Sequence, residues 1–334
     1  MPERQSYLPL AMFPGELLDP TDPPEGVSDA YGNPEPAWLH IDWRRHLRQV
    51  RAMRTEVNYV DLGPEDPPEV PIVFVHGLSG AWQNFLEQLP LFARTHRVIA
   101  LDLPGFGASP VPDWELTIRN YGRLVGEFCD ALGVERCALV GNSMGGFIAS
   151  EVAIFDPGRA ERLVLISAAG ISHARMARAP TVTAARMAAA ATPFAFRYRE
   201  RALTRPTLRH WALRNVFYKP TALRPELLWE NLQTGLNAPG FLAAVEGLVG
   251  YDFTDRLPEV EELTLIVWGR QDRVVPPRDG LEFERLIPNS RLVVFDRCGH
   301  VPQLEKPARF NALLEEFLEE PLPAAVRAAD ERVR

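Results

Sequence analysis

The sequence predicts an α/β domain with a mostly parallel central sheet, flanked by helices and interrupted once by a helical insertion. Continuous apolar runs, typical of strands buried on both faces, alternate with segments that have apolar residues at helical spacing. This alternation implies a parallel sheet with crossover connections. It stops near residue 170 and resumes near residue 263, and the residues between are rich in Ala, Arg and Pro.

The elements can be assigned in order along the chain. TEVNYVDL alternates and is expected to form the first strand, and the later apolar runs form the buried strands. The expected strands are 55–62, 70–75, 96–103, 137–142, 162–166, 263–269 and 291–295, and the expected helices are 116–134, 144–155, 280–287 and 303–320.

The same pattern divides the chain into parts. The segment up to about Pro36 is rich in Pro, Gly and acids, and is expected to be an irregular arm. Five arginines follow between Trp38 and Arg54; a solvated face is the favoured interpretation and a partner-binding patch the alternative. We expect an arm at 1–54, an α/β core at 55–170 and 263–320, a helical lid at 171–262 and a frayed tail at 321–334.

Composition excludes several classes of protein. With 334 residues, 46% hydrophobic and 24% charged, the chain is typical of a globular protein. Its net charge of -8 argues against a nucleic acid partner. Cys129, Cys137 and Cys298 form neither a disulfide framework nor a zinc motif, which favours a reducing cytoplasm. Neither a signal peptide nor a membrane-spanning stretch is expected.

A nucleophile is predicted at Ser143. Gly141-Asn142-Ser143-Met144-Gly145 matches G-x-S-x-G, with an apolar strand before it and a helix after it. In that context the serine lies on a sharp strand-to-helix turn, and its hydroxyl is held at a helix N-terminus. A chance match in a Gly-rich turn is the alternative.

A base and an acid are predicted from chain order. A serine hydroxyl needs a base, and in this arrangement the acid and then the histidine follow the serine. Among seven histidines, His300 alone follows the late strands, and Asp272 directly follows the strand at 263–269. An exposed loop histidine is the alternative for His300. Asp252 and Asp255 are weaker acids for this role, and Asp102 is expected to hold a turn.

The oxyanion produced by acyl transfer needs N–H donors. One is expected from Met144, which follows the nucleophile, and the other from Leu78, in the loop after the strand at 70–75. The glycines of this loop allow close backbone approach. An ordinary strand-ending turn at His76-Gly77 is the alternative.

From Thr55 to Glu319 the chain resembles the α/β-hydrolase superfamily. The resemblance rests on the ordered motifs VHGLSG, LDLPGFGAS, LVGNSMGGFIA, WGRQDRVVP and CGHVPQLEKPARFNALLEEFL. It implies a Ser143–His300–Asp272 triad, no cofactor, no metal, and a helical cap between the sixth and seventh core strands.

Within that superfamily, GNSMGG, WGRQDRVVP and CGH are similar to the meta-cleavage-product hydrolases, which split a carbon–carbon bond in ring-fission products. The chain departs from that family in two places, with LSGAW where a Gly-Pro-Gly stretch is usual and Val301 where Trp is usual. The same motifs occur in carboxylesterases and monoacylglycerol-type lipases. Ser143 argues against dehalogenases and epoxide hydrolases, which have Asp there.

The segment from Ser172 to Lys219 is strongly basic, with Glu200 as its one acid. A solvated helix face is the favoured interpretation; a cationic mouth for a substrate carboxylate and a basic surface that touches anionic lipid are the alternatives. Its basic residues are Arg175, Arg178, Arg186, Arg197, Arg199, Arg201, Arg205, Arg209, Arg214 and Lys219.

Three functions follow from these observations. The first is hydrolysis of a carboxylic ester with a hydrophobic acyl part, through an acyl-enzyme on Ser143. The second keeps the site and cleaves a carbon–carbon bond of a vinylogous diketo acid. The third is a ligand-binding or lyase-type relative without useful hydrolysis.

Overall fold

The computed structural model describes residues 18–64, 69–197, 199–232 and 238–322. Within them, eight strands form one sheet in the order β1-β2-β4-β3-β5-β6-β7-β8. β2 pairs antiparallel with β1 and β4, and the other pairings are parallel. The strands are β1 (Leu47–Ala52), β2 (Thr55–Leu62), β3 (Ile72–Val75), β4 (Val98–Leu101), β5 (Cys137–Asn142), β6 (Ala160–Ile166), β7 (Leu263–Gly269) and β8 (Ser290–Phe295).

The predicted α/β architecture is confirmed, but the start of the sheet is not where the sequence placed it. TEVNYVDL is the second strand, because Leu47–Ala52, assigned to the arm, forms the edge strand β1. Arg48 and Arg51 are exposed on β1, and their charges hide the strand pattern in the sequence. The predictions for residues 1–17 and 323–334 lie outside the described residues.

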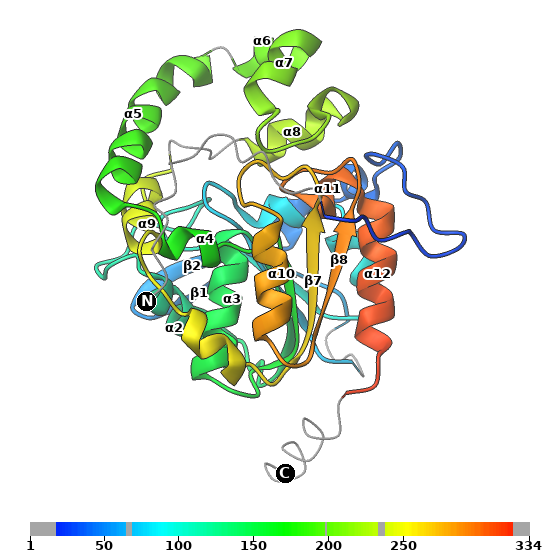
Figure 1. Ribbon diagram of the computed structural model, residues 1–334, viewed down its shortest axis with the longest axis vertical. Coiled ribbons are helices and arrows are strands. Elements are labelled where there is room, and N and C mark those ends of the chain that lie inside the picture. The colour runs from blue at the N-terminus through cyan, green and yellow to red at the C-terminus, as the bar shows by residue number, and fades with distance from the viewer. Residues whose placement is uncertain (1–17, 65–68, 198, 233–237, 323–334) are drawn as a thin grey trace.

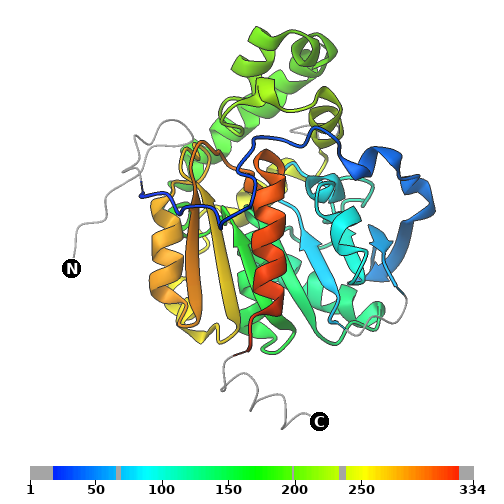
Figure 2. The ribbon, with the colours of Figure 1, turned by 90° about the vertical axis from the view of Figure 1, so that its right-hand side faces the viewer.

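Two hydrophobic cores cover the two faces of the sheet. In β3, Val73 and Val75 belong to the core under α2 and α3, while Ile72 and Phe74 belong to the core under α12. This alternation follows from the two-residue period of a strand. Figures 1 and 2 show α2, α3 and α10 on one face and α12 on the other. The covering helices are α1 (Leu89–Phe92), α2 (Ile118–Ala131), α3 (Met144–Phe155), α10 (Arg278–Leu286), α11 (Pro302–Glu305) and α12 (Pro307–Glu319).

Between β6 and β7, residues 171–262 form a segment that we call the insertion. Figure 1 shows α6, α7 and α8 above the carboxyl ends of β7 and β8, and α5 to their left, above α9. The insertion contains α4 (Ile171–Ala174), α5 (Arg178–Arg197), α6 (Arg199–Thr204), α7 (Pro206–Leu213), α8 (Pro225–Asn231) and α9 (Phe241–Leu248). Short 3-10 helices lie at Ala37–His40, Trp43–Arg45, Trp82–Phe85, Pro220–Ala222 and Thr254–Glu259.

No helix of the described residues has the length and apolar character needed to cross a bilayer. They contain no group of three or more His, Cys, Asp or Glu side chains arranged to hold a metal ion. Cys129, Cys137 and Cys298 are buried free thiols.

Candidate active site

Ser143 lies on a sharp turn between β5 and α3. Its backbone has φ 56° and ψ -117°, in the region that side chains with a Cβ rarely adopt. The turn is held from both sides, since the Ser143 N–H donates to the Ile166 carbonyl at 2.9 Å and the Ser143 carbonyl accepts from Ala169 N–H at 3.0 Å. A strained, tightly held serine is the arrangement that exposes a hydroxyl at a strand's carboxyl end.

Two glycines make this turn possible. A Cβ on Gly141 would lie 2.3 Å from the Gly145 carbonyl oxygen, and one on Gly145 would lie 2.0 Å from the Val75 oxygen. Strand β5, helix α3 and strand β3 therefore pass closer together than side chains would permit. The G-x-S-x-G spacing is a steric requirement of the turn.

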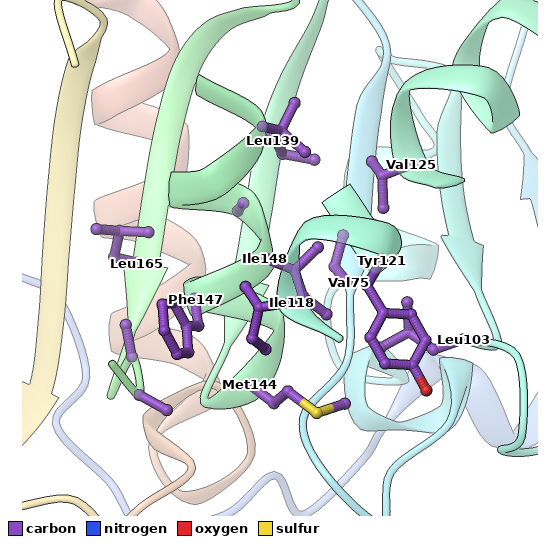
Figure 3. Close-up of a cluster of buried hydrophobic side chains, with 14 of the residues drawn as sticks. Val75, Leu103, Ile118, Tyr121, Val125, Leu139, Met144, Phe147, Ile148 and Leu165 are labelled. Atoms are coloured by element: carbon purple, nitrogen blue, oxygen red, sulfur yellow. The ribbon is translucent and has the colours of Figure 1, made fainter. Parts of the chain in front are cut away.

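Met144 is the first residue of α3, so its N–H has no acceptor within the helix. Its side chain is fully buried and points into the core toward the neighbourhood of Ile118 and Phe147 (Figure 3). The side chain is thus committed to packing, and the backbone N–H remains at the helix N-terminus, where the dipole favours negative charge.

The loop after β3 borders the serine. A Cβ on Gly77 would lie 3.0 Å from Ser143 Cβ, and Leu78 follows, partly buried. His76 anchors the loop: its Nδ1 donates to the Gly77 carbonyl at 2.7 Å and its Nε2 accepts Leu103 N–H at 2.9 Å. Burial lowers the pKa of His76 to about 4, so the ring is neutral and holds the loop.

Asp272 and His300 are directly hydrogen-bonded. His300 Nδ1 donates to Asp272 Oδ2 at 2.8 Å, and the two side chains are 7% and 0% exposed. Asp272 Oδ1 accepts Val274 N–H at 2.8 Å and Val275 N–H at 3.0 Å, which fixes the carboxylate. A carboxylate held in this way fixes the tautomer of the imidazole and leaves Nε2 as the proton acceptor.

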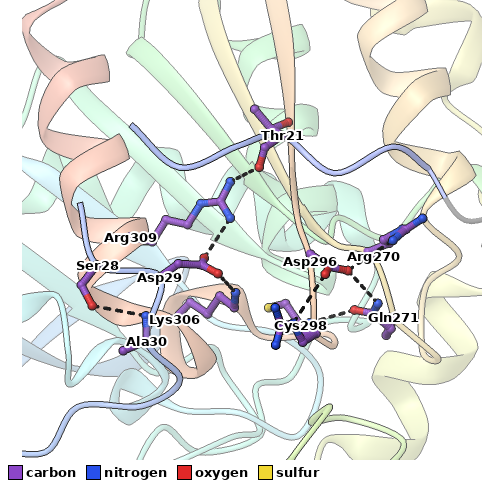
Figure 4. Close-up of polar contacts among 11 residues, drawn as sticks. Thr21, Ser28, Asp29, Ala30, Arg270, Gln271, Asp296, Cys298, Lys306 and Arg309 are labelled. Carbon is purple, nitrogen blue, oxygen red and sulfur yellow. Dashed lines mark hydrogen bonds and ion pairs between the residues drawn. The ribbon is translucent and has the colours of Figure 1, made fainter. Parts of the chain in front are cut away.

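The loops after β7 and β8, which carry these two residues, are joined by Gln271 (Figure 4). Its side chain accepts Cys298 N–H at 2.9 Å and donates to Asp296 at 3.1 Å, and its N–H donates to the Cys298 carbonyl at 2.9 Å. The acid and the histidine are therefore positioned by one hydrogen-bonded unit.

The His300 backbone is held by two further segments. Its N–H donates to the Val216 carbonyl of the insertion at 2.8 Å, and Asn142 Nδ2 lies 3.4 Å from its carbonyl oxygen. Since Asn142 precedes Ser143, the structure brings the serine turn against the histidine loop. The predicted site residues thus gather at one end of the sheet: Asp272 contacts His300 directly, Asn142 links the Ser143 turn to it, and Gly77 lies beside Ser143.

Asp102 has the structural role that the sequence suggested. Asp102 is buried and accepts hydrogen bonds from Trp82 N–H, Ala108 N–H and the Asn58 side chain at 2.8–2.9 Å. It therefore holds a turn, as predicted. Burial raises its pKa, an effect that these three donors oppose.

Sequence reasoning missed two polar residues near the site. His173, on α4, has its pKa lowered to about 4 by burial and by the neighbouring His300, and its Nδ1 has no hydrogen-bond partner among the described residues. Asp279, on α10, accepts Ser172 N–H and hydroxyl at 2.9 and 2.6 Å and so ties α4 to the core. Burial raises the pKa of Asp279 to about 6. No motif in the sequence indicates either residue.

This fold is that of a known family of enzymes. The sequence model of the alpha/beta hydrolase fold matches residues 70–307, and the chain belongs to that family of hydrolases. The match leaves out the first 69 residues, which include β1, β2 and the segment before them.

Among individual relatives, the chain is 35% identical over 259 residues to a 2-hydroxy-6-oxo-6-phenylhexa-2,4-dienoate hydrolase of Comamonas testosteroni, covering 74% of this chain and 87% of the relative. Among solved structures, a membrane phospholipase A has a TM-score of 0.65 and 28% identity, covering 84% of this chain and 86% of that one. The meta-cleavage product hydrolase CumD of Pseudomonas fluorescens IP01 has a TM-score of 0.62 and 26% identity, covering 81% and 96%.

Proposed function

We propose that Ser143, His300 and Asp272 act as a catalytic triad. Ser143 attacks a substrate carbonyl while His300 Nε2 accepts its proton, and Asp272 stabilises the imidazolium that forms. The N–H groups of Leu78 and Met144 hold the developing oxyanion. Water activated by His300 then releases the acyl group, and no cofactor takes part. The hydrogen-bonded Asp272–His300 pair, beside a strained Ser143 turn, supports these roles.

The substrate that we propose is a 2-hydroxy-6-oxo-dienoate, cleaved at its C5–C6 bond. The similarity to hydrolases of such compounds supports this choice over the ester hydrolase that the sequence placed first. Breaking this bond leaves an electron pair on C5. That is feasible once the C2 hydroxyl has become a carbonyl and C5 has gained a proton, because the pair then delocalises through the C3–C4 double bond onto the C2 oxygen. Ser143 attacks C6, which becomes the carbonyl of the released acid.

Ester hydrolysis is the second candidate. It uses the same residues and the same acyl-enzyme, with an alkoxide as the leaving group. Two departures from the carbon–carbon hydrolases favour it, LSG in the loop after β3 and Val301 after the histidine, and the likeness to a phospholipase structure supports it.

A direct comparison of substrates tests the proposal. We would measure kcat/KM of the wild type and Ser143→Ala for 2-hydroxy-6-oxo-6-phenylhexa-2,4-dienoate and for short and long p-nitrophenyl esters. The proposal expects a kcat/KM for the dienoate at least about 100-fold above that of either ester, and Ser143-dependent release of benzoate. A higher kcat/KM for an ester would replace it with the second candidate. Turnover that survives in Ser143→Ala would overturn both.

We propose that the insertion is a lid that closes over a substrate with a hydrophobic acyl part, and that its arginines bind the substrate carboxylate. Arg175, Arg178 and Arg205 are exposed, whereas the side chains of Arg197 and Arg199 lie outside the described residues. Neutralising Arg197, Arg199 and Arg201 together is expected to raise KM for the dienoate about tenfold and to leave KM for an uncharged ester unchanged. An unchanged KM for the dienoate would contradict the carboxylate role.

We propose that the outer surface of α7 contacts anionic lipid. Leu208 and Trp211 are 45% and 61% exposed, three residues apart on one helix, and the Arg214 guanidinium lies 4.2 Å from the Trp211 ring centre. Apolar side chains beside cations suit an anionic lipid surface. Sedimentation with phosphatidylglycerol vesicles, but not with phosphatidylcholine vesicles, is expected and should be lost in Trp211→Ser. Equal sedimentation with both would contradict the proposal.

We also propose that the enzyme works in the cytoplasm. Its three described thiols are free and buried, as suits a reducing compartment, and none lies in a metal-binding motif. Fractionation of cells that express the full chain tests this assignment. Recovery of the enzyme outside the cytoplasmic fraction would overturn it.

A further inference from the structure

Residues 18–40 form a strap across the outer face of α11 and α12, which we call the N-terminal strap. Figure 2 shows it running beside β8 and over the upper end of α12. Thr21 N–H donates to the Val294 carbonyl at 2.9 Å, and Thr21 Oγ1 accepts Val294 N–H at 3.0 Å. Farther along, Asp29 forms ion pairs with Lys306 and Arg309 (Figure 4). The strap is thereby fixed to the helices that follow the histidine loop.

Tyr31, within the strap, contacts two other parts of the molecule. Its hydroxyl donates to Glu305 Oε2 at 2.5 Å and accepts Lys219 N–H of the insertion at 2.9 Å. Gly32 N–H also donates to the Glu305 carbonyl at 2.7 Å. One side chain of the strap thus joins the core helix α11 to the insertion.

Glu305 also contacts the backbone of the histidine loop. Its side chain is fully buried, and its Oε1 accepts Gly299 N–H at 2.9 Å and lies 3.4 Å from Val301 N. These are the residues on either side of His300. Its Oε2 accepts Tyr218 N–H at 2.8 Å, two residues after Val216, whose carbonyl holds the His300 N–H. All the contacts of the carboxylate are with hydrogen-bond donors, which hold both of its oxygens in place.

We infer that Tyr31 and Glu305 are positioning residues that hold His300 in its working orientation, so that the N-terminal strap is part of the active-site framework. The inference rests on the proposed triad and adds a part of the chain that the family match omits. Without the Tyr31 hydroxyl, Lys219 N–H loses its acceptor and Glu305 Oε2 loses one of its two donors. Both the histidine loop and the insertion segment that holds the His300 N–H then lose a constraint.

Tyr31→Phe tests this role, and the chain offers a matched control. The Tyr251 hydroxyl makes the same kind of contacts, donating to Glu151 at 2.8 Å and accepting Arg119 Nε–H at 2.9 Å, but it lies against α2 and α3. Tyr251→Phe therefore removes equivalent hydrogen bonds away from the histidine loop.

The readout is the rate at which a fluorophosphonate probe labels Ser143 in the full chain, measured against pH. This rate depends on the Ser143–His300 pair and not on which bond the enzyme naturally cleaves. We expect Tyr31→Phe to label about tenfold more slowly and with an altered pH profile, because a misaligned His300 is a poorer base for Ser143. Tyr251→Phe should label within about twofold of the wild type and with the wild-type pH profile.

The outcomes distinguish a failure of the positioning role from a failure of the proposed triad. Equal labelling rates of Tyr31→Phe and the wild type would overturn the inference. It would also be overturned if both Phe variants lost the same labelling rate and this loss matched the fall in their urea midpoints. Glu305→Gln provides a second measurement that keeps the side chain's shape, and it should label at least as slowly as Tyr31→Phe; wild-type labelling by it would also overturn the inference. Absence of labelling in the wild type would instead overturn the proposed triad.

Discussion

The turn that holds Ser143 and the loop that holds His300 are fixed in different ways. The serine turn is shaped by close backbone packing within five residues and against β3, and two glycines are the condition for it. The histidine loop is held by Glu305, five residues after His300, and by groups far from it in sequence: Val216 and Asp272 directly, and Tyr31 through Glu305. A nucleophile can thus be specified locally, whereas the orientation of its base depends on the whole fold.

The largest expected effect tests Ser143, whose turn is shaped by local packing. Ser143→Ala should lower kcat by about three orders of magnitude or more, because the members of a triad act as a unit. Ser150→Ala is the matched control: it removes a buried hydroxyl that donates to the Gly146 carbonyl on the same helix. Its kcat should stay within a few-fold of the wild type, and a comparable loss in both variants would contradict the assignment of the nucleophile.

A smaller effect tests the steric origin of the turn. Gly145→Ala places a Cβ 2.0 Å from the Val75 oxygen, so the backbone must shift. We expect the free energy of unfolding, measured in urea, to fall by roughly 3 kcal/mol. In Gly126→Ala the nearest atom to the new Cβ is Asp156 Oδ2 at 3.6 Å, and this helical site should gain up to about 1 kcal/mol. Equal stability of the two variants would exclude the steric account.

The smallest expected effect is a change in the pH dependence of stability that arises from Glu305, which supports the histidine loop. Burial raises the pKa of Glu305 from 4.5 to about 7, despite hydrogen bonds that oppose the shift, and Tyr31, Cys298 and Lys306 are the titratable groups around it. Between these two pKa values the folded chain keeps a proton that the unfolded chain releases. Stability from this group is therefore fully present below about pH 4.5 and is lost as pH rises through about 7.

Glu305→Gln removes that titration. From pH 5 to pH 7 the free energy of unfolding should fall by about 2 kcal/mol more in the wild type than in the variant. Urea titrations of both proteins across this range measure the difference. Other carboxyl groups with a raised pKa, such as Asp279, contribute equally to both proteins and cancel. Parallel curves would show that Glu305 does not titrate in this range.

These contrasts explain what the sequence could predict. The fold followed from apolar runs of strand and helix period, and the confirmed elements are the buried ones, such as β3, β5 and α3. β1 was missed because an edge strand carries charged side chains, so Arg48 and Arg51 obscure its alternation. The ester reaction was placed first because the motifs fix the site and leave open which bond is broken.

At the site, residues with a fixed place in a motif could be predicted from the sequence. The residues that hold them in position could not. Ser143, Asp272 and His300 each follow a strand, a position that a sequence reveals. Glu305 lies five residues after His300 in QLEK and reads as an ordinary surface carboxylate. Its burial depends on Tyr31 and Tyr218, which no local pattern connects to it.

The two borders of the sheet have a consequence for self-association. An open strand edge offers unpaired N–H and C=O groups to another chain, and proteins block such edges with charge or with a covering segment. Here β1 presents exposed Arg48 and Arg51 at one border, while Thr21 pairs with Val294 on β8 at the other. Residues before Ala52 therefore protect both edges of the sheet. A chain shortened to residues 70–307 would leave both edges open to pairing with another chain, and we expect it to aggregate.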